Sequence, residues 1–383
     1  MNYRTLGKTH VKVSALGFGA MRLPTTGTET EVDEDQAIEM IRYAVDHGVN
    51  YIDTAYVYHG GNSETTVGKA LAGGYREKAY VATKLPIWNV AKIEDCDRLL
   101  DEQLARLQTD RIDFYLFHCL QEKTWPKLRD LGVLPWANKA LADGRIRHLG
   151  FSFHDTFDVF IKILDEYDWA FCQIQYNFVN EDVQAGTEGL CYAAAKGLGV
   201  IVMEPLFGGT LANPPPPIEE IWNNDHQRHR PADVALRWLW NKPEVSLVLS
   251  GMSNLEQVQE NIQSACRSGV GWLDEDEAKT ISLVQQQYKK LSPVPCTKCG
   301  YCLPCPNGVN IPINFEYYNS ATVFQGSSVM LCRNLYNMMP ESQRAGACVA
   351  CGTCEERCPQ GIEIGRIMAE VRAQFAQAGN GTR

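Results

Sequence analysis

The sequence predicts an α/β protein that consists of a (β/α)8 TIM barrel and a smaller C-terminal α-helical domain. Up to about residue 290, short apolar runs alternate with longer amphipathic ones, and eight strand-then-helix units in that length are typical of this barrel. Beyond this point the composition changes, because nine of the 14 cysteines stand at or after Cys296. We therefore place the barrel at residues 1–290, the cysteine-rich domain at 291–375 and a frayed tail at 376–383.

Each barrel strand is expected where a short apolar run lies between turn residues. The eight runs are residues 15–19, 50–53, 79–84, 112–117, 148–151, 171–175, 200–203 and 246–249. Amphipathic helices are expected between them, at residues 35–47, 93–107, 187–196, 232–240 and 254–266. A doubly wound open sheet is the competing fold, but no GxGxxG motif opens the chain.

Two segments of the barrel domain differ from this pattern. Residues 3–14 are typical of a small hairpin that closes the bottom of the barrel, with its turn at residues 7–9. Residues 214–217 are four consecutive prolines, which we expect to form neither helix nor central strand. We expect them to form a stiff loop at the carboxyl end of the seventh strand, either as a rigid surface turn or as a lid.

The composition argues against nucleic acid and membrane as partners. Lys and Arg number 36 against 46 Asp and Glu, a net charge of −10, whereas phosphate binding relies on clustered cations. No apolar stretch reaches the roughly 20 residues that cross a bilayer, and the first residues do not lead into an apolar signal core. The expected location is the cytoplasm and the expected partner a small molecule.

Four residues with acid–base chemistry stand at or just after the ends of consecutive predicted strands. Asp53 ends the second strand, Lys84 the third and His118 the fourth, and Tyr58 lies five residues after Asp53. In a barrel these strand ends converge on one mouth. Each residue alone has a structural interpretation, such as an ion pair or a core histidine, but their order along the strands favours a common site.

Together the four residues would make a proton-donating unit. A tyrosine has a pKa near 10, and a neighbouring lysine cation favours the phenolate and lowers that pKa. We expect Asp53 to hold Lys84, His118 to orient a substrate carbonyl, and Tyr58 to be the general acid in reduction or the base in oxidation.

Eight of the cysteines fall into two runs with the spacing of iron–sulfur ligands. The first run is C-x2-C-x2-C-x2-C-P and the second is C-x2-C-x2-C-x3-C-P, the full bacterial ferredoxin pattern. Because the fourth cysteine of such a run serves the other cluster, we predict two crossed [4Fe–4S] sites. One is held by Cys296, Cys299, Cys302 and Cys358, and the other by Cys348, Cys351, Cys354 and Cys305.

The alternative is a pair of structural zinc sites, because CxxC pairs also bind zinc. Zinc needs four ligands with a spacer between pairs rather than two runs of four that each end in Cys-Pro, so the pattern favours iron–sulfur clusters. The 42 residues between Cys305 and Cys348 resemble the helical insert of α-helical ferredoxins. The clusters would transfer electrons or be structural.

Several barrel segments resemble the aldo-keto reductase family. They are Tyr3-Arg4-Thr5-Leu6-Gly7, Leu16-Gly17-Phe18-Gly19-Ala20-Met21, Tyr51-Ile52-Asp53-Thr54-Ala55 with Tyr58, and the run from Asp113 to His118. With the cysteine-rich domain, the whole chain resembles the ferredoxin-fused, iron–sulfur branch of that family. The resemblance implies a barrel that binds NAD(P)H across its mouth and gives Asp53, Tyr58, Lys84 and His118 the roles above.

The resemblance also implies residues that bind the nucleotide. Ser152 and Gln173 match the carboxamide-binding residues, and Glu260 and Asn261 match the pair on the adenine side. The further positions are Met203, Leu206, Gly208, Gly251 and Ser253. Met203 stands where many members have a tyrosine that stacks on nicotinamide. Residues 251–254 lack the Lys or Arg usually set against the 2′-phosphate, which favours NAD over NADP.

Three functions follow from these features. The first is an NAD(P)-dependent oxidoreductase that interconverts a carbonyl and an alcohol, with an Asp-Tyr-Lys-His tetrad. The second is a reductase that receives single electrons from a ferredoxin-like partner through the clusters. A bound flavin would assist it, because nicotinamide transfers two electrons and a cluster transfers one. The third is a redox sensor with a vestigial barrel site.

Overall fold

The computed structural model describes residues 1–28, 30–224, 230–296, 298, 300–324, 327–358 and 360–376. It forms two compact units, one made of residues 1–205 and 232–274 and the other of residues 206–231 and 275–383. Each unit is described by itself below. Of the predicted tail at 376–383, Ala376 is the last residue of a helix, and residues 377–383 lie outside the described residues, as do Cys299 and Pro359. The domain boundary at residue 290 remains a prediction.

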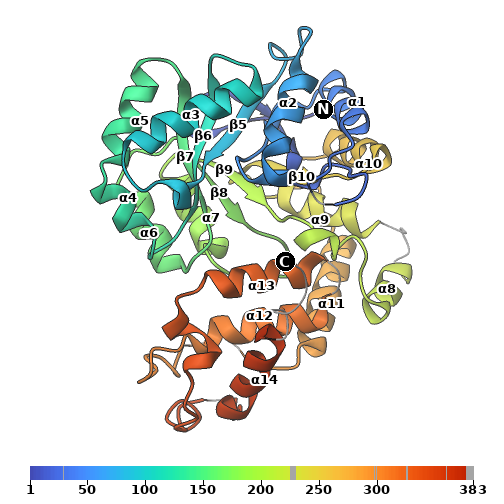
Figure 1. Ribbon diagram of the computed structural model, residues 1–383. Helices are drawn as coiled ribbons and strands as arrows, with labels where there is room; N and C mark the ends of the chain where they lie inside the picture. The colour runs from blue at the N-terminus through green and yellow to red at the C-terminus, as the bar shows by residue number, and fades with distance from the viewer. Residues whose placement is uncertain are drawn as a thin grey trace. The chain divides into compact units, whose positions relative to one another are not determined.

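The first unit contains a closed barrel of eight parallel strands in the order β10-β3-β4-β5-β6-β7-β8-β9 (Figure 1). All eight strands of the predicted barrel are confirmed. Their sequences are apolar runs because one face of each strand lines the barrel interior and the other packs against the surrounding helices. The strands are β3 (Leu16–Gly19), β4 (Tyr51–Asp53), β5 (Tyr80–Leu85), β6 (Ile112–Leu120), β7 (Ile146–Phe153), β8 (Phe171–Gln175), β9 (Gly199–Met203) and β10 (Val245–Gly251).

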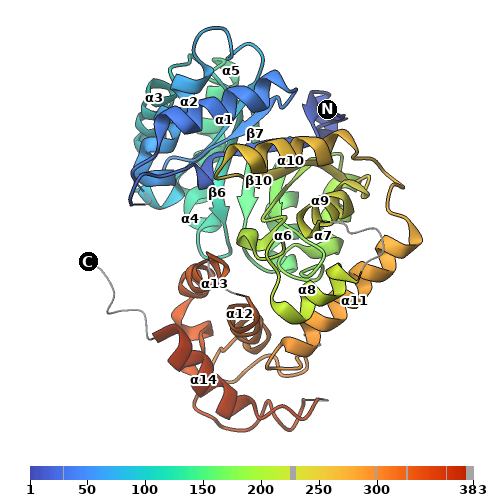
Figure 2. The ribbon, with the colours of Figure 1, turned by 90° about the vertical axis from the view of Figure 1, so that its right-hand side faces the viewer.

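Helices surround the barrel, and each buries one apolar face against the strands. In α1 (Glu34–Asp46), for example, Ala37, Ile41 and Ala44 recur at helical spacing and are buried, and Asp33 caps the first turn. Helices α10, α1, α2 and α3 follow one another around one side (Figure 2). The other helices here are α2 (Asn62–Leu71), α3 (Glu94–Leu107), α4 (Trp125–Asp130), α5 (Val133–Ala142), α6 (Phe157–Asp165), α7 (Gly186–Ala195), α9 (Pro231–Trp240) and α10 (Leu255–Cys266).

The predicted hairpin closes the amino-terminal end of the barrel. Strands β1 (Tyr3–Thr5) and β2 (Lys12–Ser14) pair antiparallel around the 3₁₀ turn η1 (Gly7–Thr9). Leu6 and Val13 are fully buried in one cluster with residues from the strands. The hairpin therefore leaves the carboxyl ends of the strands as the open mouth. Further 3₁₀ turns are η2 (Ala20–Arg22), η3 (Tyr58–Gly61), η4 (Ile87–Asn89), η5 (Phe207–Gly209), η6 (Glu341–Gln343) and η7 (Ala345–Ala347).

The second unit is helical, as expected for the segment between the cysteine runs. Its helices are α8 (Pro216–Asn223), α11 (Glu275–Leu291), α12 (Ile311–Val323), α13 (Ser327–Met338) and α14 (Ile364–Ala376). Helix α12 packs against both α13 and α14, and α11 packs against α8. The two cysteine runs lie in the loops before α12 and before α14.

The proline run corrects one prediction. Residues 214–217 were expected to form a loop throughout, but α8 begins at Pro216. Proline is excluded from a helix interior because it lacks an N–H, yet the first turn of a helix needs no N–H donor to a preceding carbonyl. Pro216 and Pro217 therefore occupy the first turn and rigidify its start.

The helices of the described residues include none with the length and hydropathy of a membrane span.

The close packing of α2 against α3 gives a stability prediction. A Cβ on Gly68 would lie 2.6 Å from the backbone oxygen of Arg106. We expect Gly68→Ala to lower the free energy of unfolding by about 1–2 kcal/mol, because overpacking costs more than the roughly 1 kcal/mol gain in helix propensity. Urea unfolding followed by circular dichroism measures this. Gly346→Ala, with no atom within 4 Å of its Cβ, is the control; equal stability of both variants would contradict the tight contact.

Candidate functional site

The tetrad residues come together at the carboxyl ends of β4, β5 and β6, which are neighbours in the barrel. Asp53 is the last residue of β4, Lys84 the penultimate residue of β5, and His118 lies near the end of β6. Tyr58 opens the short turn η3. The predicted convergence on one mouth is therefore present in the geometry, because parallel neighbours end at the same rim.

The strongest polar contact of the site is a buried ion pair. The Lys84 ammonium lies 2.6 Å from Oδ1 of Asp53 and 2.8 Å from the carbonyl oxygen of Thr54. It also hydrogen-bonds the Tyr58 hydroxyl and lies 5.0 Å from the centre of that ring. All three ammonium protons therefore have partners. Lys84 is 1% exposed and Asp53 is 3% exposed, so this pair is screened from water.

Burial and charge act in opposite directions on the pKa values of the pair and of Tyr58. Burial lowers the pKa of Lys84, but Asp53 and Tyr58 outweigh it, so that pKa is raised and the ammonium stays charged. For Tyr58, burial raises the pKa and the Lys84 cation lowers it, with a net rise. The cation acts in the expected direction, but burial is the larger effect. The hydroxyl therefore stays protonated at neutral pH and can donate its proton.

His118 lies beside the Tyr58 ring as a neutral imidazole. Its ring meets the Tyr58 ring edge-on at 6.1 Å, and the ring of Trp88, which is 53% exposed, lies 5.0 Å away. Burial lowers the pKa of His118 well below its usual value, and the charge of Lys84 adds to this effect. Nδ1 of His118 is buried without a hydrogen-bond partner among the described residues. A ligand polar atom would satisfy it.

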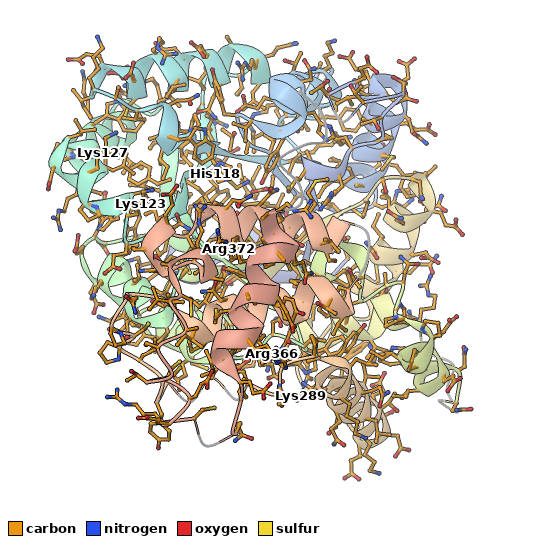
Figure 3. All side chains as sticks on the ribbon, turned by 60° about the horizontal axis from the view of Figure 1, so that its bottom comes forward. His118, Lys123, Lys127, Lys289, Arg366 and Arg372 are labelled. Atoms are coloured by element: carbon orange, nitrogen blue, oxygen red, sulfur yellow. The ribbon has the colours of Figure 1, made fainter. Side chains whose placement is uncertain are left out.

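A bulge in β6 sets the direction of His118. The register between β6 and β7 shifts after Phe117, and Cys119 has a positive φ of 59°. The Cys119 N–H donates to the hydroxyl oxygen of Ser152 at 2.8 Å, which fixes the bulge to β7. Bulges next to active sites re-aim side chains. Figure 3 shows His118 at this strand end, with the exposed Lys123 and Lys127 on the segment that follows.

Two buried residues that the sequence analysis missed hold β5 in place from behind. Glu64 on α2 accepts hydrogen bonds from the Thr83 hydroxyl at 2.6 Å and from Nε2 of Gln103 at 2.7 Å. Gln103 on α3 also donates to the carbonyl oxygen of Lys84 at 3.0 Å. Arg106 pairs with the remaining oxygen of Glu64. The sequence feature that could have identified Glu64 and Gln103 is a polar residue on the otherwise apolar face of each helix.

The predicted carboxamide-binding residues lie side by side in the barrel. Ser152 of β7 and Gln173 of β8 are paired in register, and both are buried. Nε2 of Gln173 lies 3.5 Å from the sulfur of Met203, while Oε1 is buried without a partner among the described residues. The Ser152 hydroxyl can donate to the oxygen of a carboxamide, and the unpartnered Gln173 Oε1 can accept from its NH2 group. These residues therefore fit a nicotinamide group.

The predicted adenine-side residues lie at the end of β10 and on α10. Asn261 is buried and donates to the Ser250 hydroxyl at 3.0 Å, and Glu260 precedes it. Ser253 donates its N–H to Gln257. Gly251 ends β10, and a Cβ built on it would lie 2.7 Å from Cγ of Arg22. The half-exposed Arg22 side chain therefore occupies the space beside Gly251. Leu206 and Gly208 belong to the other compact unit.

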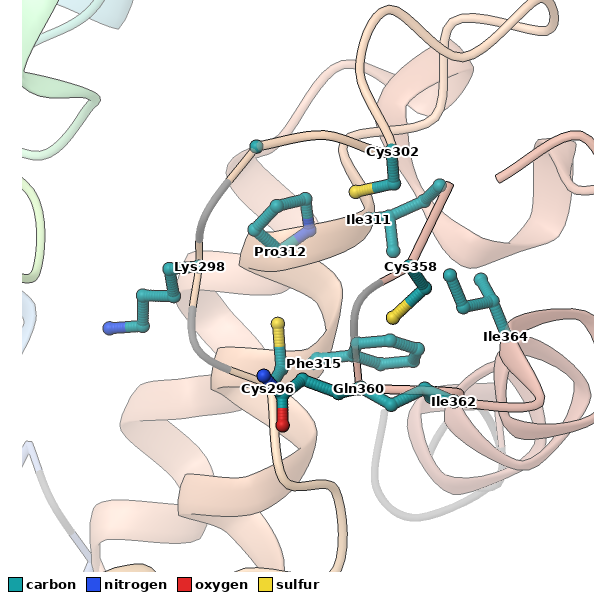
Figure 4. A pocket seen from close by; sticks show the side chains of 11 residues that line it. Cys296, Lys298, Cys302, Ile311, Pro312, Phe315, Cys358, Gln360, Ile362 and Ile364 are labelled. Atoms are coloured by element: carbon teal, nitrogen blue, oxygen red, sulfur yellow. The ribbon is translucent and has the colours of Figure 1, made fainter. Parts of the chain in front are cut away.

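In the second unit, cysteines from both runs meet at one pocket (Figure 4). Cys296 and Cys302 of the first run and Cys358 of the second run line it. The remaining lining is mostly apolar and includes Ile311, Pro312, Phe315, Ile362 and Ile364. Three thiols around a largely apolar pocket fit an iron–sulfur cluster, which thiolates hold by its irons. Cys299 would be the fourth ligand and lies outside the described residues.

The other predicted cluster site also combines both runs. Burial raises the pKa of Cys354, and the thiols of Cys348 and Cys305 are near enough to raise it further. Cys305 of the first run is thus close enough to Cys354 of the second run to act on its pKa. Among the residues that the structure describes, no three His, Cys, Asp or Glu side chains lie close enough together to bind one metal ion. A cubane differs from an ion because each thiolate binds a different iron.

Matching residues of the two runs share one backbone conformation. Lys298 and Ala350, each directly before the second cysteine of its run, have positive φ values of 55° and 53°. Gly300 and Gly352, each directly after that cysteine, have φ values of 77° and 81°. Left-handed residues of this kind occur in backbone concavities whose N–H groups bind anions and iron–sulfur clusters.

Comparison with known proteins agrees with both halves of this description. The model of the aldo/keto reductase family matches residues 15–281, and that of the 4Fe-4S dicluster domain matches residues 295–363. The fold and mouth define a barrel oxidoreductase with an appended ferredoxin-type domain. The chain belongs to the aldo/keto reductase family, since the family model covers more than two thirds of its length.

The chain also resembles individual members. L-galactose dehydrogenase of Arabidopsis thaliana is 28% identical over 312 residues, 76% of this chain and 96% of that protein. The solved structure of an aldo-keto reductase from Bacillus halodurans has a TM-score of 0.62 and 24% identity. One from Klebsiella pneumoniae in complex with NADPH has a TM-score of 0.61 and 24% identity. Each structure match covers 74% of this chain and 96% of the other.

Proposed function

We propose that the chain is an NADP(H)-dependent oxidoreductase that interconverts a small carbonyl compound and its alcohol. The observation that carries this proposal is the buried Lys84–Asp53 ion pair beside the Tyr58 hydroxyl. A buried ion pair lowers the stability of the fold unless hydrogen bonds compensate its charged atoms. Of the atoms of this pair, only Oδ2 of Asp53 lacks a hydrogen-bond partner among the described residues. The arrangement supports a function in proton transfer.

The chain's own residues divide the proton chemistry among them. In reduction, Tyr58 donates its proton to the carbonyl oxygen, and the Lys84 ammonium stabilises the phenolate that remains. His118, neutral at physiological pH, orients the carbonyl oxygen by hydrogen bonding. Asp53 keeps Lys84 charged and in place. When bound, the nicotinamide supplies the hydride in reduction and accepts it in oxidation.

Residues of the barrel would hold the nucleotide along the mouth. Ser152 and Gln173 offer the hydroxyl and amide that a carboxamide requires, and Glu260 with Asn261 would hold the adenine side. The lack of a cation in residues 251–254 favours NAD, but the Arg22 side chain beside Gly251 supports NADP. Its guanidinium would pair with the 2′-phosphate. We therefore propose NADP(H), which the Klebsiella pneumoniae relative binds.

A sugar-like substrate fits the mouth best. The exposed face of Trp88 lies beside the neutral His118, and an aromatic face next to uncharged hydrogen-bonding groups suits a neutral polyhydroxylated molecule. The relative named L-galactose dehydrogenase supports the same class. Two [4Fe–4S] clusters with crossed ligands complete the protein. Because such thiolate sites need a reducing compartment, we place it in the cytoplasm.

Electron exchange with a ferredoxin-like partner is the second candidate function. The loops that carry the cysteines expose apolar side chains, since Tyr301 and Val349 are each 65% exposed. Cys351 is exposed as well. Clusters close to the surface favour one-electron exchange with another protein. A flavin in the anaerobically purified protein, which would link two-electron and one-electron steps, would support this function over the first.

Tyr58→Phe tests the proposed acid. We expect kcat for reduction to fall by roughly 10²–10⁴ because the proton donor is lost. In the unmodified enzyme, reduction should be flat from about pH 6.5 to 9, since His118 is neutral and Tyr58 protonated there, whereas oxidation should rise with pH as phenolate forms. Anaerobic assays of NADPH oxidation with sugar aldehydes measure both directions.

Tyr56→Phe is the matched control for this experiment. Tyr56 donates its hydroxyl to Glu102 at 2.7 Å instead of to the tetrad, so its loss should leave kcat and iron content unchanged. Comparable activity of the Tyr58 and Tyr56 variants would refute the assignment of Tyr58 as the acid.

Arg22→Ala tests the proposed cofactor choice. We expect the Kd of NADPH to rise about tenfold or more, because a charge-assisted bond to phosphate is lost, while the Kd of NADH changes little. Arg22→Lys keeps the charge and should retain most of the preference. Fluorescence titration of the tryptophans measures both constants. If the Kd values of NADPH and NADH rose equally, Arg22 would not be the residue that binds the 2′-phosphate.

The crossed ligation of the clusters is tested by pairs of substitutions. The unmodified protein should hold about eight iron atoms, and Cys358→Ser about four. Adding Cys296→Ser to Cys358→Ser should cost no further iron, whereas adding Cys348→Ser should remove almost all of it. Iron and acid-labile sulfide are measured after anaerobic purification. The reverse pattern would mean that each run serves its own cluster, and bound zinc without sulfide would exclude clusters.

A further inference from the structure

A cavity lies beside the hairpin at the amino-terminal end of the barrel, opposite the mouth that holds the tetrad. Its volume is about 420 Å³, within the range of cavities that hold small molecules. The residues that border it include Tyr80 at the start of β5, Asp113 and Phe114 at the start of β6, and Arg147 and His148 at the start of β7. All of them belong to the first compact unit. The tetrad uses none of these residues.

One buried carboxylate in this cavity is surrounded by three guanidinium groups. Asp113 is 1% exposed, and it accepts the N–H of Val81 at 2.9 Å, which ties β6 to β5. Its carboxylate lies 2.8 Å from Arg76, 3.3 Å from Arg147 and 3.9 Å from Arg111. Three cations around one anion leave a local excess of positive charge. A second anion at this place would therefore be stabilised.

The arginines differ in what they offer to a ligand. Arg76 donates to the Thr109 hydroxyl and to the carbonyl oxygen of Ala79, so it is part of the local fold. Arg147 borders the cavity, and its side chain is 50% exposed. Its hydrogen bond to Asp113 uses one of the five N–H donors of a guanidinium. Because the donor pairs of a guanidinium match the two oxygens of a carboxylate, Arg147 is suited to bind one.

A second wall of the cavity is aromatic and uncharged. The His148 ring stacks on Phe114 at 5.1 Å and 22°, and Tyr80 meets Phe114 edge-on at 5.8 Å. Phe114 covers one face of the imidazole, so the rest of that half-buried ring borders the cavity. Burial and the Arg147 charge lower the pKa of His148, while Asp113 opposes them, and the imidazole is neutral at pH 7. A flat ring would pack well against this wall.

We propose that the cavity is a binding site for a small aromatic carboxylate, which pairs with Arg147 through its carboxylate and packs its ring against His148. Val11 of the hairpin adds apolar surface to the same wall. The excess of positive charge selects an anion, and the aromatic wall selects a ring over a bare ion such as acetate. The site is separate from the proposed function, because the tetrad lies at the other end of the strands.

Titration of the anaerobically purified full-length protein with 2-naphthoate tests the proposal. We expect 2-naphthoate to bind at least about tenfold more tightly than 2-naphthylmethanol, which has the same rings without the charge. Acetate, which has the charge without the rings, should also bind more weakly because it buries little apolar surface. Isothermal titration calorimetry measures the three Kd values. Equal affinity for 2-naphthoate and the neutral alcohol would overturn the proposal.

Substitutions at the cavity identify the residue that binds the carboxylate. Arg147→Gln should raise the Kd of 2-naphthoate about tenfold or more and leave that of 2-naphthylmethanol nearly unchanged. Arg98→Gln is the matched control, because the Arg98 side chain is 52% exposed and pairs with Glu102 on α3. It should leave both Kd values unchanged. Val11→Trp fills the cavity and should weaken both ligands, so it carries the test if Arg147→Gln does not fold.

The mouth of the barrel is the competing site for an aromatic acid. Trp88→Ala changes the mouth and should leave the Kd of 2-naphthoate unchanged. Bound 2-naphthoate should slow hydrogen exchange at residues 144–148 and have no effect at residues 58–61. The opposite result in either measurement would place the ligand at the mouth and refute the inference. A protein that binds no NADP(H) but passes these tests would refute the proposed function alone.

Discussion

The buried contact between Lys84 and Asp53 is the constraint on which the rest of the barrel site depends. Removing two charges from water is unfavourable unless each is compensated, and here an ammonium with three partners supplies the compensation. That compensation requires β5 to continue past Ala82, the register partner of Asp53, so that the Lys84 ammonium reaches Asp53 and the Thr54 carbonyl. The buried Glu64 and Gln103 hold this part of β5 by bonding to Thr83 and to the backbone of Lys84.

The same ion pair determines the state of the other two residues. The Lys84 charge favours the Tyr58 phenolate and opposes burial, while it disfavours protonation of His118 and so acts with burial. Burial is therefore the main reason that the imidazole is neutral, and the Lys84 cation adds to it. At Tyr58 the same cation partly offsets the rise in pKa that burial causes. The site is suited to donate a proton to a carbonyl oxygen and to hold that oxygen without a second positive charge.

In the second unit, the two cysteine runs share the same backbone conformation beside their second cysteine. Both cysteine runs have positive φ values directly before and after the second cysteine, and each places its fourth cysteine with the other run. In the proposed crossed ligation, each site would depend on both loops. The loop after β9 belongs to this unit, in which the Ser328 hydroxyl donates to the carbonyl oxygen of Phe207.

The sequence by itself determined the strands, the spacing of the cysteines and the order of the tetrad, because each depends on local periodicity or on adjacency along the chain. Only the tertiary structure decided how far burial outweighs Lys84 at Tyr58, since desolvation is set by neighbours distant in sequence. It also decided the approach of Arg22 to Gly251 and the bulge at Cys119. These arise from packing between strands, and no local pattern encodes them.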